Sequence, residues 1–524
     1  MENSGLSLVT VVLFLPLIGF FILLFVPDGQ SRNIKYLALG TTLVTLVLSL
    51  LLWAGYDSSN PGLQMVQRAD WLPQYGISYY VGIDGLNLIL VILTAFMMPL
   101  AVLISFSAHV IQERGREKLY YMFMMLLEFA MIGVFVAQDL LIFFVFWEVT
   151  LVPMYFLIGI WGGEQRVYAA VKFFLYTMAG SVLMLLALLY VGLNAGTFAV
   201  PEIVAGVQNG SIVFPFSDLF STQAVLFLAF FIAFAIKVPI WPLHSWLPDA
   251  HVQAPTAGSV ILAAILLKMG TYGMLRFCLP LFPEASVAWA PIIAVLAVIG
   301  IIYGAWVSFA QTDMKKLVAY SSVSHMGFIV LGIFALNAAG IQGAIIQMVN
   351  HGVSTGGLFF IVGMLYERRH TKELSAFGGL WKSMPLLGAI SLVVVLSSMG
   401  MPGLNGFVGE FTILLGAIGS TVLGLFYALL AALGIILAAI YMLYFFQKIF
   451  MGELSKEENR HLPKLEWNEI AVLVPILVLI VLIGIQPYIF MKPSDTTVEH
   501  LVAQVAPENA VTTIAQLPET QSGD

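Results

Sequence analysis

The stretch Phe227-Leu-Ala-Phe-Phe-Ile-Ala-Phe-Ala-Ile-Lys237-Val-Pro239-Ile-Trp-Pro242 decides the fold, because it belongs to an apolar run long enough to enter a membrane. A lysine at the bilayer centre costs roughly 2.5–3.5 kcal/mol on insertion scales. Pro239 removes a backbone donor and breaks the helix. A buried charge beside a broken helix is typical of midplane sites in ion-translocating membrane proteins. We therefore predict a proton-carrying Lys237; the alternative is a side chain that extends to the membrane surface.

The composition excludes a soluble protein. Of the 524 residues, 60% are hydrophobic and only 10% are charged, with a mean hydropathy of +0.97. The single Cys278 excludes cysteine-ligated iron–sulfur clusters, cysteine-rich zinc sites and internal disulfides within this sequence. The sequence also has no dinucleotide-binding or phosphate-binding glycine motif, so we expect no redox cofactor and no metal in this chain. The net charge of −7 gives no reason to expect nucleic-acid binding.

The apolar runs predict an all-α polytopic membrane protein with about fourteen transmembrane helices. The first run, Leu6–Val26, is too long for the core of a signal peptide, and we interpret it as a spanning helix. The expected spans are 6–26, 36–55, 83–107, 119–137, 140–160, 168–194, 223–247, 255–278, 288–310, 317–336, 340–365, 385–418, 421–446 and 467–490.

The distribution of basic residues supports this number of helices. Loops that follow odd-numbered helices hold 16 of the 22 lysines and arginines, whereas loops after even-numbered helices and the tail hold only Arg68 and Lys492. Basic loops lie on the inner side of a membrane. The asymmetry therefore predicts that both termini lie on the outer side. The 16 residues are Arg32, Lys35, Arg114, Arg116, Lys118, Arg166, Lys315, Lys316, Arg368, Arg369, Lys372, Lys382, Lys448, Lys456, Arg460 and Lys464.

Two proline-broken segments suggest an internal repeat. Lys237-Val-Pro239 and Pro402-Gly-Leu-Asn-Gly-Phe-Val-Gly-Glu410 each place a charge beside a break, in predicted helices seven and twelve. Each repeat has five helices, an odd number, so the second copy must be inverted in the membrane. We expect residues 1–118 to form three helices with an outer loop, 119–279 the first repeat, 288–450 the second, 467–490 the last helix and 491–524 a polar, poorly ordered tail. Within the outer loop, residues 71–82 alternate like a short hairpin.

Six ionisable residues are predicted near mid-depth in six different helices. Each adds a cost of insertion, so a purely structural role for all six is the weaker interpretation. Burial disfavours the charged form of a lysine or glutamate and a nearby opposite charge favours it, which suits reversible proton transfer. Each histidine alone is as readily interpreted as a packing residue. The six are Glu148, Lys237, Lys268, His325, His351 and Glu410, with Ser321, Ser322, Ser324, Gly352, Ser354 and Thr355 near them to bind water or admit close packing.

Five other ionisable residues are weaker candidates. Glu128 is either an auxiliary carboxylate or a packing residue, and Lys172 lies close enough to a helix end to reach the surface. His244, Asp249 and His251 follow the break in predicted helix seven and are either a proton entrance or solvated loop residues. The prolines around them favour a rigid turn over a metal site.

At these residues the chain resembles the antiporter-like membrane subunits of respiratory complex I, the NADH:quinone oxidoreductase, which are related to Mrp-type sodium/proton antiporter subunits. The resemblance covers about residues 82–450. It rests on Gly82-Ile-Asp-Gly-Leu-Asn, on the segments 147–162, 172–177 and 237–251, and on Ala319-Tyr-Ser-Ser-Val-Ser-His-Met-Gly. At the position of Glu410 the M-type, which is the mitochondrial subunit four type, carries glutamate, whereas L-type, N-type and Mrp subunits carry lysine. The chain therefore resembles the M-type here.

The resemblance implies that Glu148 and Lys237 form a switching pair, that Lys268 and the histidines connect it, and that Glu410 is the outlet. It implies two inverted five-helix units and a place beside L-type and N-type subunits in the lipid bilayer, most simply a bacterial plasma membrane. NADH, FMN, iron–sulfur clusters and quinone would then bind to partner subunits. The alternatives are an Mrp-type antiporter subunit, an M-like subunit of a photosynthetic complex in a thylakoid membrane, and a scaffold without transport activity.

Overall fold

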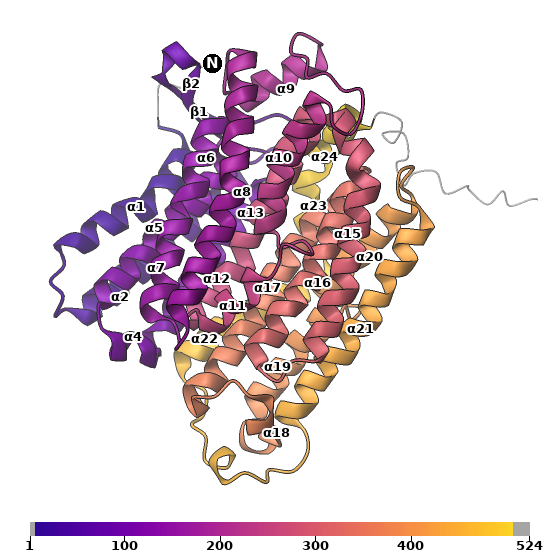
Figure 1. Cartoon of the computed structure of the whole chain (residues 1–524). Helices are drawn as coiled ribbons and strands as arrows, with labels where there is room; N and C mark the ends of the chain where they lie inside the picture. The colour runs from indigo at the N-terminus through magenta and orange to yellow at the C-terminus, as the bar shows by residue number, and fades with distance from the viewer. Residues whose placement is uncertain (1–5, 507–524) are drawn as a thin grey trace, which may run out of the picture.

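The computed structural model describes residues 6–506, which form a bundle of long helices (Figure 1). Twelve helical segments within this range are long and apolar enough to cross a membrane, and they coincide with twelve of the fourteen predicted spans. They are α1 (Leu8–Phe25), α2 (Ser31–Ala54), α3 (Leu88–Ile104), α5 (Glu117–Val136), α6 (Leu140–Val149) with α7 (Leu151–Trp161), α8 (Arg166–Ala195), α12 (Thr256–Ile261) with α13 (Leu267–Gly273) and α14 (Leu279–Leu281), α15 (Pro283–Phe309), α16 (Met314–Phe334), α17 (Ala338–Arg369), α21 (Leu425–Phe450) and α22 (Trp467–Ile485).

The other two predicted spans are each split into two short helices. The first consists of α10 (Thr222–Lys237) and α11 (Trp246–Gln253), and the second of α19 (Pro385–Ser398) and α20 (Asn405–Ile418). Helix α10 ends at Lys237, two residues before Pro239. Between α19 and α20 the chain turns through Gly400 and Gly403, whose positive φ angles of 76° and 88° suit glycine. The breaks lie where the two proline motifs predict them, whereas the inverted repeat itself stays a prediction.

Polar residues at the helix ends set several boundaries. The side chain of Asp139 accepts hydrogen bonds from two backbone amides at the start of α6. Asp313 and Asn337 cap α16 and α17 in the same way. Each cap satisfies donors that the first turn of a helix leaves free, so the helices begin at these residues.

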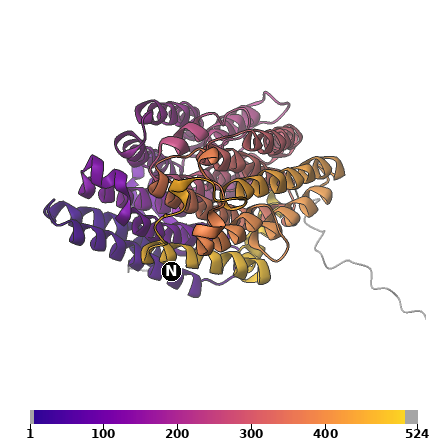
Figure 2. The same ribbon diagram turned by 90° about the horizontal axis from the view of Figure 1, so that it is seen from below.

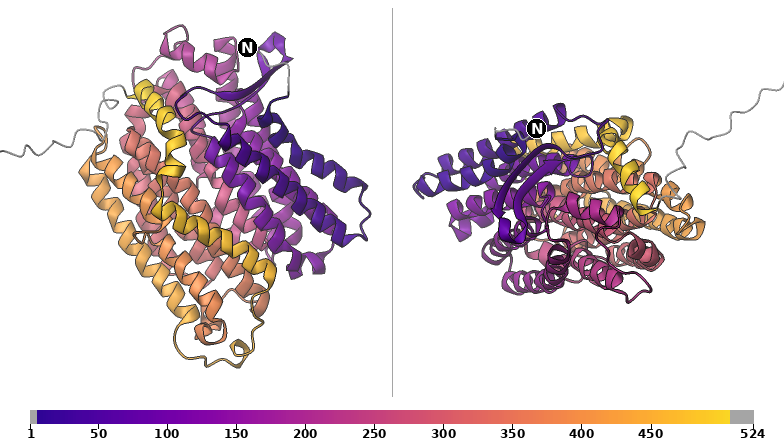
Figure 3. Two further views of the ribbon diagram at one scale, coloured as in Figure 1. Left: turned by 180° about the vertical axis from the view of Figure 1, so that it is seen from behind. Right: turned by 90° about the horizontal axis from the view of Figure 1, so that it is seen from above.

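The two ends of the bundle differ in structure. A two-stranded antiparallel hairpin, β1 (Gln64–Leu72) and β2 (Ile77–Ile83), lies at one end together with α9 (Val200–Gln208) and α24 (Asp495–Val505) (Figures 1 and 3). The opposite end carries α4 (His109–Arg114), α18 (Leu380–Ser383) and the loops and helix ends that hold the 16 basic residues. The predicted hairpin is therefore present, although its first strand begins earlier than the alternating stretch. The short α23 (Tyr488–Met491) leads from α22 to α24.

The C-terminal segment corrects one prediction. The polar, poorly ordered tail was expected from residue 491, but α24 is a packed helix whose apolar residues are three or four positions apart and buried. Gly85 contacts it closely: its amide donates to Thr497 Oγ1 at 3.2 Å, and a Cβ on Gly85 would lie 2.5 Å from the Pro493 carbonyl oxygen. The prediction from composition missed α24 because the helix is short and amphipathic, so the segment is polar on average. The rest of the predicted tail, 507–524, lies outside the described residues.

The burial of the helices shows which of them form the centre. The apolar stretches of α12–α14 and of α17 are buried entirely, whereas less than half of those of α1 and α2 is buried. Viewed along the bundle, the N-terminal helices lie on one flank of the molecule (Figure 2). Polar side chains on α13 and α17 consequently meet other helices and not lipid.

Candidate functional site

Lys237 lies inside the protein at the last residue of α10. Its side chain is buried, and Nζ donates a hydrogen bond to Thr150 Oγ1 at 3.2 Å. The same nitrogen lies 4.7 Å from the centroid of the Trp147 ring, a favourable cation–π distance. This position does not fit the alternative of a lysine extending to the membrane surface. Thr150, which the sequence did not single out, joins α6 to α7.

Glu148 lies on α6, between Trp147 and Thr150 in the sequence. Among the described residues it forms no ion pair with Lys237 within 4.0 Å. Its Oε1 atom is buried and has no hydrogen-bond partner among the described residues. Lys237 contacts the hydroxyl of Thr150 instead. The structure therefore presents the predicted acid and amine apart.

Lys268 and His351 contact each other directly. Lys268 Nζ is 2.5 Å from His351 Nδ1 and donates to the backbone oxygen of Ala263 at 2.6 Å. Ala263 belongs to a π-helical turn, Leu262–Leu266, that interrupts the regular helix before α13. Such turns are frequent at functional sites. Two positive charges this close repel each other, so the pair suits one shared proton.

His325 and Glu410 form the next contact. His325 Nδ1 is 2.8 Å from Glu410 Oε1, and the Tyr441 hydroxyl is 3.2 Å from His325 Nε2. Gln347 donates to the same carboxylate oxygen at 3.2 Å. The rings of His325 and His351 lie with their centroids 5.9 Å apart, which brings the two contacts together. Lys268, His351, His325 and Glu410 thus form a series through α13, α17, α16 and α20.

A small polar space adjoins this series. Its volume is about 10 Å³, close to the room that a single water needs. Side chains at its wall are linked: Ser354 Oγ lies 2.7 Å from Ser397 Oγ, Ser397 donates to Asn405 Oδ1, and Asn350 donates to the Asn405 carbonyl oxygen at 2.7 Å. Hydroxyl and amide groups of this kind can hold and orient a water molecule.

Comparison with known proteins identifies the family. The family model described as "NADH:quinone oxidoreductase/Mrp antiporter, TM" matches residues 137–435. The NADH-quinone oxidoreductase subunit M of Rhodobacter capsulatus is 44% identical over 95% of this chain and 96% of its own length. The chain belongs to the NADH:quinone oxidoreductase/Mrp antiporter family. The NADH-ubiquinone oxidoreductase chain 4 of Arabidopsis thaliana is also similar, with 43% identity over 93% of this chain and 95% of that protein.

Solved structures of the family share the fold. A chain of respiratory complex I from Thermus thermophilus with bound NADH superposes with a TM-score of 0.84 and 32% identity, covering 95% of this chain and 99% of that one. A chain of the Mrp complex from Dietzia sp. gives 0.77 at 23% identity, covering 96% and 52%, which shows the fold alone. The chain is therefore an integral, multi-pass membrane protein.

The weaker candidates fall into different surroundings. Glu128 is fully buried, and neither carboxylate oxygen has a partner among the described residues. Lys172 forms an ion pair with Asp249 at 2.7 Å and so does not simply extend to the surface. His244 lies against the ring of Tyr303, and His251 stacks on Phe359 with both ring nitrogens unpartnered among the described residues. Within residues 6–506, no group of three histidine, cysteine, aspartate or glutamate residues is placed to hold a metal ion.

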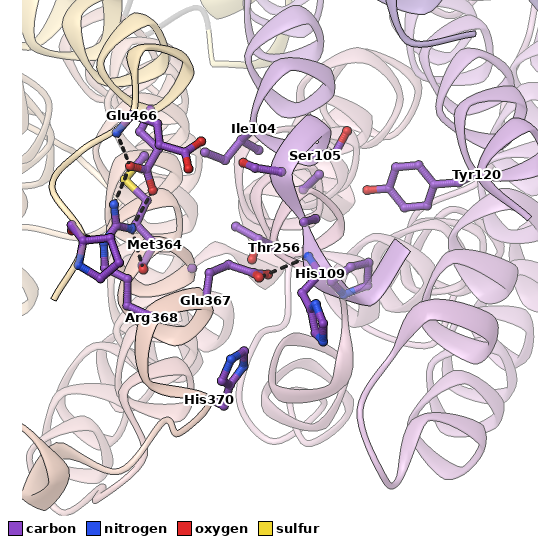
Figure 4. Close-up of a pocket in the computed structure, with 17 residues that line it drawn as sticks. Ile104, Ser105, His109, Tyr120, Thr256, Met364, Glu367, Arg368, His370 and Glu466 are labelled. Atoms are coloured by element: carbon purple, nitrogen blue, oxygen red, sulfur yellow. Dashed lines mark hydrogen bonds and ion pairs between the residues drawn. The ribbon is translucent and has the colours of Figure 1, made fainter. Parts of the chain in front are cut away.

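A wide polar pocket lies at the basic end of the bundle, away from the series (Figure 4). It has a volume of about 300 Å³. Arg368 at the end of α17 binds Glu469 of α22 through two contacts of 2.6 Å, and the His109 amide donates to Glu367 at 3.1 Å. None of the six predicted residues lines it. A neighbouring pocket of about 340 Å³ includes Gln253, two residues beyond His251.

The approach of α13 to the end of α10 depends on Gly270. A Cβ on Gly270 would lie 2.7 Å from the Phe234 backbone oxygen and 2.6 Å from a methyl of Val238. This packing holds the segment with Lys268 beside the end of α10 at Lys237.

We expect Gly270→Ala to destabilise the bundle by about 1–3 kcal/mol, because the backbone of α10 cannot yield to the added methyl group. The effect is measured by heating the purified complex and following how much of this subunit stays in it as the temperature rises. Gly300→Ala in α15 is the matched control, since its Cβ would meet nothing closer than 3.9 Å. Equal stability of the two variants would contradict the close packing at Gly270.

Proposed function

We propose that this chain is the proton-translocating M-type membrane subunit of an NADH:quinone oxidoreductase. The observation that carries the proposal is the buried series Lys268, His351, His325 and Glu410, in which successive groups hydrogen-bond or lie ring to ring. Relatives more than 40% identical over nearly their whole length are named as subunit M or chain 4 of that enzyme. Their names support the M-type assignment, as glutamate at position 410 does.

The proton would move by changes in the contacts of Lys237. When the Glu148 carboxylate approaches, it favours the charged amine, and when it withdraws, burial favours release of the proton. Thr150 holds the amine in the separated arrangement. A released proton passes to Lys268 and His351 through ordered water, then to His325, and Glu410 delivers it. His244 lies in the break after α10, and His251 lies on α11 two residues before Gln253, which lines the neighbouring pocket; this order along the chain suits a proton entrance.

The redox chemistry would take place on partner subunits. NADH, FMN, iron–sulfur clusters and quinone are assigned to those partners, and this chain would couple to them through its contacts with L-type and N-type neighbours. We further propose that the basic end of the bundle faces the inside of a bacterial plasma membrane and the hairpin end the outside. The names of the relatives favour this assignment over an Mrp-type antiporter subunit, which shares the fold.

The proposal predicts proton transport that does not depend on sodium. In vesicles that contain the purified complex, NADH oxidation should build the same pH gradient in sodium-free potassium medium as in sodium medium. The gradient is read from the quenching of a pH-sensitive dye, with a protonophore as the control that collapses it. A gradient that vanishes without sodium would favour the antiporter assignment instead.

A further inference from the structure

A second polar cluster lies between Lys268 and the hairpin end of the bundle. Lys268, Tyr272 and Arg276 are four residues apart along α13 and the π-helical turn Met274–Cys278, so they follow one side of a fully buried helix. Arg276 ends the row against Asp84, at the turn between β2 and α3, with Nη2 to Oδ1 at 2.6 Å. Sequence reasoning left Arg276 and Asp84 without a role.

Side chains of the cluster bind to one another and to the backbone carbonyl oxygen of Phe135. Arg276 Nε donates to the Tyr272 hydroxyl at 3.0 Å, and that hydroxyl donates to the Phe135 carbonyl oxygen at 2.8 Å. Asn87 donates to the same carbonyl at 2.9 Å and accepts from the Asp84 amide. The cluster therefore joins three segments, α5, α13 and the start of α3.

A cavity of about 490 Å³ begins on the far side of the cluster. Asp84 and Arg276 line it together with Tyr80, Gln138 and His500. Gln138 is fully buried, and neither its amide nitrogen nor its oxygen has a partner among the described residues. Such a space suits water that enters from the hairpin end and reaches Arg276.

We propose that Arg276, held by Asp84 and Tyr272, is a charge barrier that separates Lys268 from this cavity and keeps protons from leaking between them. The inference rests on the proposed proton-translocating function. A guanidinium group keeps its proton in proteins, so Arg276 cannot pass one on as a histidine does. A fixed positive charge in a narrow polar path excludes protons and other cations. The cluster is thus a barrier and not an outlet.

The test measures the passive proton permeability of vesicles that contain the whole complex, without NADH. Glutamine fills much of the volume of arginine without its charge. For Arg276→Gln we expect quinone reduction to continue, its stimulation by a protonophore to disappear, and the leak to rise about tenfold, which corresponds to a barrier lower by about 1.4 kcal/mol.

Two further variants separate a leak through this path from general damage. Arg68→Gln breaks the exposed Arg68–Glu202 pair at the same end of the bundle and should leave the leak unchanged. Adding Lys268→Met to Arg276→Gln should remove the leak, because the path would then lack its proton acceptor.

Tight vesicles with Arg276→Gln would overturn the barrier, and so would a leak that persists in the double variant. If Arg276→Gln does not assemble, Arg276→Met, which also removes the charge and keeps a long side chain, carries the test, and tight vesicles with that variant overturn the proposal. The proposed function is tested separately by Lys237→Met, which should lose pumping while the vesicles stay tight.

Discussion

We expect Lys237→Met to reduce NADH-driven proton pumping in the assembled complex by at least about tenfold. Methionine keeps most of the volume of lysine beside Trp147 and Thr150 but cannot carry a proton. Removing a buried charge also removes an insertion cost, so assembly should be preserved. The measurement compares the initial rate of dye quenching in vesicles with the rate of quinone reduction in the same preparation.

The matched control is Lys448→Met. Lys448 also has its ammonium group over an aromatic ring, 5.4 Å from the centroid of Tyr444, but it lies exposed near the basic end of α21. Its replacement should leave pumping unchanged. Full pumping by Lys237→Met, with normal amounts of the subunit in the complex, would remove Lys237 from the proposed path.

Glu410→Gln should reduce pumping about tenfold as well, because an amide cannot exchange a proton with His325. The substitution keeps the shape of the side chain and a hydrogen-bonding atom for Gln347, so the surrounding helices should stay packed. Coupled quinone reduction should fall with pumping and should not be restored by a protonophore, since the path itself is blocked.

Glu202→Gln provides the comparison for Glu410→Gln. Glu202 is a half-exposed carboxylate at the hairpin end, paired with Arg68. Partial burial raises the pKa of this carboxyl, but hydrogen bonds from Thr197 and Arg68, with the charge of Arg68, hold it below its usual value. Its neutralisation should change neither rate. If Glu410→Gln pumps normally, the outlet lies elsewhere and the series ends at His325.

The residues that sequence reasoning found are those that are costly in a membrane. Lys237, Lys268 and Glu410 stand out because each interrupts an apolar run, and the pattern of basic loops places their helices. The histidines were open to either interpretation, and the ring and carboxylate contacts of His325 now give it a position in the series. Which of these residues has a role in transport is a prediction that the experiments above decide.

The partners of these residues could not be predicted. Thr150, Gln347, Asn405 and Tyr441 are ordinary in a membrane helix, and spacing within one helix does not tell which neighbour it faces. The separation of Glu148 from Lys237 depends on how α6 and α10 pack, which has no signature in either segment. Helix α24 was missed because its buried face is only four apolar residues long.

The complete burial of the apolar stretch of α17 limits how this molecule can work. A carrier that alternates between two open faces needs one half that rocks as a rigid body against the other along a smooth surface. Every residue of the 32-residue α17 from 343 to 365 is buried, and His351 lies near the centre of the helix. Sliding it would break contacts on every side at once, so we expect the proposed proton transfer to proceed by small rotations of side chains and rearrangements of water while the helices stay in place.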